Sequence, residues 1–389
     1  MVVHGYLKGN TYEIGQKLDI KSHYGEWNAV LINCQWRFVD TFWGANALGS
    51  ETATNAAQLS TDENYFVPDP QHLIYTHFPE EEKWQLLEDP VSFKEWGEQA
   101  YLKERFFELE LRVLSHNQCE ITTDNGEVEM MFALPKKKAK DLAFMVIIYL
   151  KEFNEWKLLD DKKIQHDLIH VPLPEAIVVK LRLPKRGIYR VELVGKDTSI
   201  TTKGYDFDWI AIYKVKSEQG ARPYSGFPRI GAAGWGPGNS HRLEDLGLTA
   251  LKHTQGLIFA KDGFTKVRFQ FENPDLKDLQ LSVKLITVKE SLDDVLTETE
   301  GVRVESHDKH VLDLETTPGE ESAVCIFALV EDEVYGSAEV NICNYLIVSF
   351  AIDELTLKDI ESTRKGKNAL MSGNITNLTG EVILHNEYF

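Results

Sequence analysis

The sequence lacks any long apolar run and has no recognisable leader. Its longest apolar stretch, Tyr345–Ile352, is far shorter than the roughly 20 residues that a helix needs to cross a bilayer. No secretory signal precedes His4, since a signal peptide would need a basic segment followed by an apolar one. We therefore expect no membrane insertion and a cytoplasmic location.

Basic residues and cysteines are also scarce. Lysine and arginine number 42 against 61 acidic residues, which gives a formal net charge of -19. Such a surface does not neutralise phosphates, so nucleic acid is excluded as a partner. The four cysteines are far apart and have no metal-binding spacing: Cys34, Cys119, Cys325 and Cys343. The glycine-rich stretch 231–238 lacks the Lys and Ser/Thr of a phosphate-binding loop, so we expect no cofactor and no metal.

The stretch Gly25–Gly44 carries the clearest local pattern in the chain. Aromatic and branched residues alternate with polar ones on both sides of Asn33 and Cys34, which predicts two antiparallel strands joined there by a tight turn. Asp40 lies at the end of this hairpin, among tryptophans expected to pack inward: Trp27, Trp36 and Trp43.

Short segments follow for the rest of the chain. Ser92 and Glu95 form a capping-box pair, which predicts a helix from Phe93 toward Glu104. From Phe106 onward, many short alternating segments separated by turn residues predict antiparallel sandwiches. The expected strands are 128–134, 142–150, 176–183, 187–194 and 209–215, then 256–260, 265–271, 279–285, 302–305, 311–314, 324–330 and 345–350, with alternation also over 107–113.

Residues 2–96, with strings such as GYLKG, DPQHLIYTHFP and WQLL, resemble the kyphoscoliosis peptidase and hillarin family of the transglutaminase-like superfamily. The resemblance implies a mainly β fold with an α+β N-terminal part. A partial transglutaminase-like domain, related to papain-like cysteine proteases, would occupy residues 1–105. Two immunoglobulin-like antiparallel β-sandwich modules would follow at 106–216 and 217–352. Residues 353–389 would form a C-terminal tail or an edge strand.

Chemistry in this superfamily needs a cysteine nucleophile, a histidine base and an orienting carboxylate. The resemblance assigns Asp40 as the carboxylate and places the histidine fifteen residues earlier, where this chain has Gly25. It places the cysteine helix upstream of Met1. His23 is the displaced candidate for the base, but two residues along an extended strand amount to about 6.6 Å. A base must come within about 3 Å of its proton, so we expect His23 to be an exposed strand-end residue unless a bulge moves it.

Cys34 is not expected to replace the nucleophile, because a turn cysteine lacks the helix N-terminus that lowers a thiol pKa. Asp40 has two compatible explanations: a remnant of the triad, or a hairpin-end carboxylate that accepts hydrogen bonds from backbone N–H groups or a tryptophan indole. His72 and His77 are five residues apart, without a further Cys or His nearby for a metal site.

The sequence therefore predicts a non-catalytic, transglutaminase-like protein that acts through protein partners as a scaffold. The resemblance implies a cytoskeletal setting and cytoskeletal partners. The alternative is an active cysteine peptidase or protein cross-linking enzyme of which this sequence is a truncated part. A hairpin with Asp40 but without its histidine favours the first interpretation.

Overall fold

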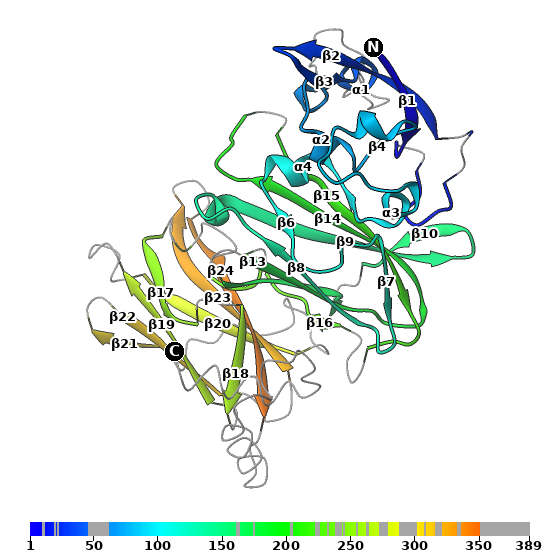
Figure 1. The fold of residues 1–389 in the computed structure, drawn as a ribbon. Helices are drawn as coiled ribbons and strands as arrows, with labels where there is room; N and C mark the ends of the chain where they lie inside the picture. Colours follow the sequence, from blue (N-terminus) through cyan, green and yellow to red (C-terminus); the bar gives the residue numbers. More distant parts are fainter. Residues whose placement is uncertain are drawn as a thin grey trace, which may run out of the picture. The chain divides into compact units, whose positions relative to one another are not determined.

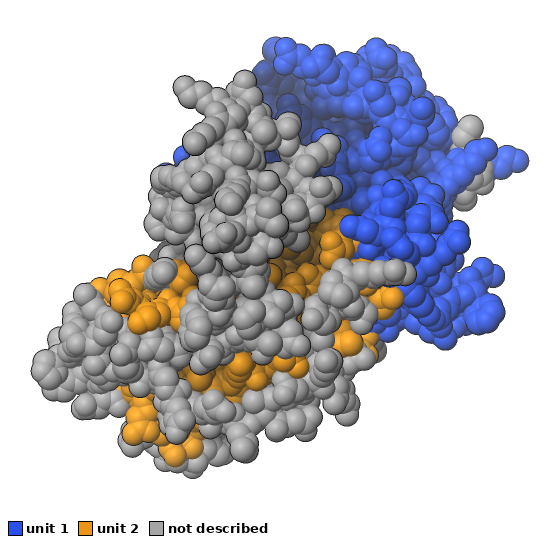
Figure 2. Space-filling view, turned by 90° about the horizontal axis from the view of Figure 1, so that it is seen from below, with its two compact units in different colours: residues 1–126, 130–159, 185–220 blue, residues 127–129, 160–184, 221–389 orange. Residues whose placement is uncertain are grey.

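The computed structural model describes residues 1–9, 12–18, 21, 23–45, 62–160, 164–173, 176–202, 205–221, 226–231, 233–237, 243, 246–253, 256–261, 264–271, 279–287, 302–306, 309–315, 321–332 and 336–350. They fall into two compact units, drawn as a ribbon in Figure 1 and coloured separately in Figure 2. Unit 1 comprises residues 1–126, 130–159 and 185–220; unit 2 comprises residues 127–129, 160–184 and 221–389. The fold is mainly antiparallel β, as the sequence predicts.

A four-stranded sheet in the order β3-β2-β1-β4 begins unit 1 (Figure 1). Its strands are antiparallel: β1 (Val2–Leu7), β2 (Tyr24–Ile32), β3 (Gln35–Val39) and β4 (His77–Pro79). One face is apolar, because Val3, Trp27, Ala29 and Phe38 share a buried cluster. The predicted hairpin is confirmed, although Trp36 at its outer end is 38% exposed and packs edge-on against Trp84.

Short helices lie between β3 and β4 and in the segments that follow β4. They are α1 (Thr41–Ala45), η1 (Glu63–Tyr65), α2 (Pro70–Leu73), η2 (Glu82–Gln85), α3 (Phe93–Glu98), α4 (Glu104–Glu108) and η3 (Ala139–Asp141). The capping box of Ser92 and Glu95 is present at the start of α3, as predicted. That helix ends at Glu98, sooner than expected. The strand-like alternation over 107–113 is wrong at its start, because α4 continues to Glu108 and buries Phe106.

The second sheet of unit 1 has the strand order β10-β9-β14-β15-β5, and β7 pairs in parallel with β15. Its strands are β5 (Tyr101–Leu102), β7 (Glu120–Thr123), β9 (Leu142–Glu152), β10 (Glu155–Leu158), β14 (Gly187–Asp197) and β15 (Asp208–Ser217). The three long strands lie close to their predicted ranges. β6 (Arg112–Val113) pairs with the end of β8 (Glu127–Ala133).

The two sheets of unit 1 are joined by buried contacts rather than by a linker. Tyr12, Ile14, Tyr101 and Cys119 form one cluster that includes side chains from both sides of the expected boundary at 105/106. Lys8 is fully buried and donates from Nζ to the carbonyl of Trp96 at 2.5 Å; burial lowers the pKa of Lys8 to about 8. The expected domain boundaries remain a prediction.

Unit 2 contains the two-stranded pair β11-β16 and strands of a four-stranded sheet in the order β12-β13-β8-β6. β11 (Ile164–Gln165) pairs with β16 (Phe227–Pro228), and β12 (Asp167–Leu173) pairs with β13 (Ala176–Arg182). Arg182 lies over the ring of Phe227 and forms a two-point ion pair with Glu321, one contact being 2.8 Å. A bidentate, partly buried pair of this kind fixes geometry as well as charge, so β13 is held against the strands that follow.

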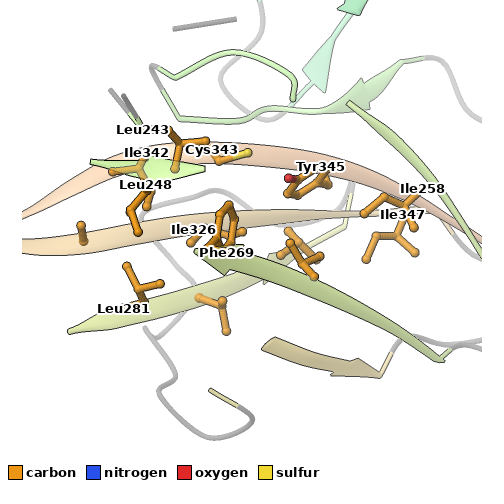
Figure 3. Close-up of a cluster of buried hydrophobic side chains, with 14 residues drawn as sticks. Leu243, Leu248, Ile258, Phe269, Leu281, Ile326, Ile342, Cys343, Tyr345 and Ile347 are labelled. Carbon is orange, nitrogen blue, oxygen red and sulfur yellow. The ribbon is translucent and has the colours of Figure 1, made fainter. Parts of the chain in front are cut away.

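Two further four-stranded sheets are described in unit 2, as expected for the second predicted sandwich. One has the order β17-β19-β22-β21 and the other β18-β24-β23-β20. Their strands are β17 (Leu248–Lys252), β18 (Leu257–Lys261), β19 (Phe264–Phe271), β20 (Leu281–Ile286), β21 (Val302–Ser306), β22 (Lys309–Glu315), β23 (Glu321–Asp332) and β24 (Gly336–Phe350). Phe269, Ile326 and Tyr345 share the buried core drawn in Figure 3.

A buried pair of asparagines fastens the segment 231–236 to this sandwich. Nδ2 of Asn344 donates to the carbonyls of Gly234 (2.8 Å) and Gly231 (3.3 Å) and to Oδ1 of Asn341 (3.0 Å). Nδ2 of Asn341 donates in turn to Oδ1 of Asn344 and to the carbonyl of Ile326. The sequence of residues 217–240 is typical of a linker, but these hydrogen bonds attach its residues Gly231 and Gly234 to the sandwich of unit 2.

Two further expectations concern the C-terminal residues and membrane-spanning helices. The predicted tail or edge strand at 353–389 lies outside the described residues. Within the described part, no helix is long and apolar enough to cross a membrane.

Candidate functional site: a buried Asp40–His77 pair

The turn of the β2–β3 hairpin positions Asp40. Asn33 and Cys34 both have positive φ, 50° and 63°, which is the geometry of a type I′ hairpin turn. The hairpin register then places Asp40 directly after β3, at the start of α1. Its Oδ1 accepts from the backbone N–H groups of Phe42 (2.9 Å) and Trp43 (2.8 Å). This confirms the expectation that Asp40 bonds nearby backbone, and it makes Asp40 the N-cap of α1.

The second carboxylate oxygen of Asp40 meets a histidine that the sequence did not point to. Oδ2 lies 3.0 Å from Nε2 of His77, and the two side chains are 2% and 0% exposed. His77 is the first residue of β4, where it pairs with Leu7 of β1. Each oxygen of Asp40 therefore has a defined partner inside the protein.

The other ring nitrogen of His77 is also bonded. Nδ1 lies 2.8 Å from the hydroxyl of Thr76, which lies 3.3 Å from the carbonyl of Leu73. An ionised carboxylate only accepts, so Nε2 of His77 carries the proton that it donates to Asp40. In neutral His77 the Thr76 hydroxyl then donates to Nδ1. Nε2 is then protonated and bonded to Asp40, and Nδ1 accepts from the Thr76 hydroxyl, so the ring has no lone pair left for any nucleophile other than that hydroxyl.

Aromatic rings enclose the pair. The ring of His77 lies 5.1 Å from that of Trp27, 4.6 Å from that of Trp43 and 6.1 Å from that of Tyr65. Because these rings exclude water, burial lowers the pKa of His77, against the opposing influence of Asp40. The site holds a neutral histidine beside a carboxylate in a dry aromatic shell.

This assignment predicts a pH dependence of stability. The pKa of His77 in the folded protein lies below its unfolded value of about 6.5, so the unfolded chain binds more protons below that pH. The free energy of unfolding should consequently fall as pH drops below about 6.5, by at most about 1.4 kcal/mol per pH unit from this group. Above that pH His77 should contribute no slope.

The measurement is histidine side-chain NMR between pH 5 and 8, with the His77 signals assigned by their loss in His77→Gln. We expect a neutral ring protonated on Nε2 throughout pH 6 to 8. Lys103 and Glu104 also influence this ring, so Glu104→Gln serves as a control for their contribution. A His77 ring that titrates at or above pH 6.5 would contradict the assignment.

The position expected to hold the base is filled by another side chain. Gly25 pairs with Gly5 across β1 and β2 and lies on the same sheet face as Trp27. A Cβ atom built on Gly25 would lie 2.2 Å from Cδ1 and 2.7 Å from Cγ of Leu7. Leu7 thus occupies the space that a side chain at position 25 would need.

His23 is not brought to Asp40 by any bond that the structure describes. It is 8% exposed, so the expectation of an exposed strand-end residue is wrong. Its Nε2 lies 2.5 Å from Nε2 of Gln16, and its ring lies edge-on to Tyr12. The role of His23 as a displaced base remains untested, and the histidine that Asp40 contacts is His77.

The four cysteines have contrasting surroundings. Cys34 is exposed in the hairpin turn, and the other three are buried. Burial raises the pKa of the Cys325 and Cys343 thiols to about 12, and it also raises that of Cys119. High thiol pKa values disfavour the thiolate that a nucleophile requires. Over the described ranges, no three His, Cys, Asp or Glu side chains are grouped to hold a metal ion.

In the sequence, His77 stands out only through its spacing from His72, which lacks the further Cys or His that a metal site needs. The signal that could have found it is its position between Thr76 and the apolar pair Phe78-Pro79, which predicts a short buried strand carrying a polar side chain. Asp40, the partner of His77, lies 37 residues earlier in the sequence. The sheet order β3-β2-β1-β4 brings the two residues together.

Comparison with known proteins supports the family resemblance. Residues 93–228 match the model of the KY-like, immunoglobulin-like domain. Hillarin of Drosophila melanogaster is 24% identical over 67% of this chain and 33% of its own length. The Lim and transglutaminase domain protein ltd-1 of Caenorhabditis elegans is 24% identical over 70% of this chain and 39% of its own length. The kyphoscoliosis peptidase of Mus musculus is 25% identical over 70% of this chain and 37% of its own length.

The chain thus spans between a third and two-fifths of the length of these curated relatives. A marsupial T cell receptor structure aligns with 62% of this chain and 73% of its own at 11% identity, and its TM-score of 0.21 is too low to support a conclusion. The names of the relatives and of the matched domain agree with the family that the motifs in residues 2–96 suggest. The chain is a relative of hillarin and the kyphoscoliosis peptidases.

Proposed function

We propose that this chain is a non-catalytic, transglutaminase-like protein that acts as a scaffolding interaction module in a cytoplasmic, cytoskeleton-associated setting. The observation that carries the proposal is the filled base position: Gly25 stands where the resemblance places the histidine, and Leu7 occupies the space beside it. Asp40 keeps its position, but its oxygens bind the start of α1 and His77. The framework of a catalytic site would then serve stability.

Exposed apolar side chains on the hairpin support contacts with other proteins. Leu31 and Trp36 are register partners at its outer end, and they are 58% and 38% exposed. Ile32 beside them is 42% exposed. Neighbouring exposed apolar residues of this kind often mark protein-binding surfaces. The relatives ltd-1 and mouse kyphoscoliosis peptidase are matched over 39% and 37% of their own length, so the activities in their names are not assumed for this chain.

The filled position gives a stability prediction. Gly25→His should lower the free energy of unfolding by about 1–3 kcal/mol, the usual cost of overpacking, because its Cβ would collide with Leu7. In a Leu7→Ala background the same substitution should cost less than about 0.5 kcal/mol. Denaturant titration of the four proteins of this cycle measures the coupling. Equal costs in the two backgrounds would show that Leu7 does not fill the position.

The function itself is tested by activity and by partner capture. The chain, expressed with any coding sequence that precedes it in the longest transcript, is assayed for peptidase activity and for incorporation of a fluorescent amine into casein. We expect neither. In residues 1–389 taken alone, we expect a cysteine-directed electrophile to label Cys34 only, because the other three cysteines are buried, with loss of label in Cys34→Ser. Co-sedimentation with a cytoskeletal fraction at mild salt is the expected positive result, and its absence would count against scaffolding.

The alternative, an active cysteine peptidase or cross-linking enzyme, makes the opposite predictions. It requires a reactive cysteine in an upstream segment and a histidine that can serve it. Activity that is lost in His23→Ala would support the displaced base. Activity that survives in His23→Ala and is lost in His77→Gln, with folding intact, would assign the base to the histidine that Asp40 contacts.

A further inference from the structure

A pocket of about 200 Å³ opens on unit 1 beside the buried pair, between the segment 63–76 and the segment 102–107. Leu73, Thr76 and Leu102 contribute buried side chains to it. The volume is below the roughly 300–1,000 Å³ of sites for drug-sized molecules and cofactors. A pocket of this size suits a single side chain.

The charge around the pocket is negative. Glu63, Asp69 and Glu104 line it, and no lysine or arginine is among its lining residues. Glu104 is engaged already, because it accepts from the Tyr65 hydroxyl and lies 3.7 Å from Nζ of Lys103. Glu63 and Asp69 are exposed, and Asp69 uses only Oδ1 to cap α2, through the N–H of Gln71. Two carboxylates therefore face solvent at the pocket with acceptor oxygens to spare.

Aromatic faces complete the lining. The rings of His72 and Phe107 are stacked at 4.2 Å with an angle of 17° between their planes. Phe66, also part of the lining, is 69% exposed, which is unusual for so large an apolar side chain. Planar rings next to carboxylates attract a cation through its charge and through its contact with the ring face.

We propose that this pocket binds a basic side chain, arginine in preference to lysine, from a partner protein. Arginine is favoured because its flat guanidinium stacks on aromatic rings and binds carboxylates with two parallel hydrogen bonds. The proposal deepens the proposed function, on which it rests for the nature of the partner: a protein with a basic, flexible segment. An acidic ligand or a nucleotide is excluded by the charge of the lining.

The test uses a capped pentapeptide, Gly-Gly-Arg-Gly-Gly, and matched peptides with lysine or citrulline in place of arginine. Backbone amide NMR of the whole chain follows Leu73, Thr76 and Leu102 during titration. We expect saturable shifts with the arginine peptide at a dissociation constant on the order of 1 mM, weaker shifts with lysine and none with citrulline. The His77 ring signal should move as well, because the Thr76 hydroxyl joins it to the pocket.

Glu63→Gln combined with Asp69→Asn removes two charges and keeps a capping residue at position 69. In this variant the affinity for the arginine peptide should fall by a factor of about ten or more. Glu82→Gln with Glu88→Gln removes the same charge from exposed positions outside the lining and should bind as the natural chain does.

Equal binding of the arginine and citrulline peptides, no saturable shift with either, or unchanged binding in the pocket variant would each overturn the proposal. Peptide binding is measured without any cytoskeletal partner, so its failure leaves the scaffold test independent. A chain that co-sediments but ignores the arginine peptide would show that a different surface makes the contact.

Discussion

Asp40→Ala should lower the free energy of unfolding of unit 1 by about 2–4 kcal/mol, because a buried neutral donor left without its acceptor costs about 1–3 kcal/mol and the loss of a helix cap adds to it. The substitution leaves the Nε2 proton of His77 without an acceptor inside an aromatic shell. It also removes the N-cap of α1, which by itself is worth about 1 kcal/mol. The two losses come from different oxygens of one carboxylate, so they are expected to add.

Asp40→Asn should cost much less, about 2 kcal/mol or below. Asparagine still caps α1 through its side-chain oxygen, while its amide group faces His77. The ring can adapt by moving its proton from Nε2 to Nδ1: Nε2 then accepts from the amide, and Nδ1 donates to the Thr76 hydroxyl. That hydroxyl can turn to the carbonyl of Leu73, which lies 3.3 Å away.

Hydrogen exchange read by mass spectrometry, on peptides from β1 to β4, measures the stability of unit 1 separately from that of unit 2. Nitrogen NMR of the His77 ring reads the position of its proton in the natural chain and in Asp40→Asn. Equal destabilisation by alanine and asparagine, or an unchanged tautomer in Asp40→Asn, would refute the adaptation. A negligible effect of Asp40→Ala would show that the pair contributes nothing to stability.

The second large effect is expected in unit 2, where Asn344→Ala should cost about 3–5 kcal/mol. The side chain donates to the carbonyls of Gly231 and Gly234 and exchanges hydrogen bonds with Asn341. Asn344 is fully buried, so its removal leaves several buried polar groups without partners, each at about 1–3 kcal/mol. The same substitution at an exposed strand position would be nearly neutral.

Hydrogen exchange of peptides from β23 and β24 measures this change, with Ser337→Ala on the exposed part of β24 as the matched control. Asn341→Ala should have a similar effect, and the double variant should cost clearly less than the sum of the two, because the side chains bond each other. Additive losses would show that the two asparagines act independently.

Much of the local structure could be predicted from the sequence. The hairpin follows from alternation around Asn33 and Cys34, and both residues adopt the positive φ that its tight turn requires. The capping box at Ser92 begins its helix as expected. The long strands from β8 onward lie near their predicted ranges, because residues that alternate every second position must face one side of a sheet.

Other predictions failed where the sequence pattern was short or was compatible with both a strand and a helix. Alternating residues at 107–113 read as a strand, but a single helical turn also buries every third or fourth side chain, and α4 places Phe106 inside. The sequence pattern does not reveal β7 and β10 because they are only four residues long, nor β12, because Pro172 and a shift of register interrupt its alternation. His23 was expected to be exposed, and tertiary contacts with Gln16 and Tyr12 bury it.

The sequence by itself determined the relation of this protein to hillarin and the kyphoscoliosis peptidases and its mainly β fold, and it puts Gly25 where that resemblance expects a histidine. Those properties follow from the residue types and from the regular spacing of apolar residues along the chain. Only the tertiary structure decided which histidine Asp40 meets, what fills the space beside Gly25, and where carboxylates and rings surround a pocket. Each of these depends on side chains that are tens of residues apart in the sequence and are brought together by strand order and register. No local pattern in a single sequence shows which of these distant residues come into contact.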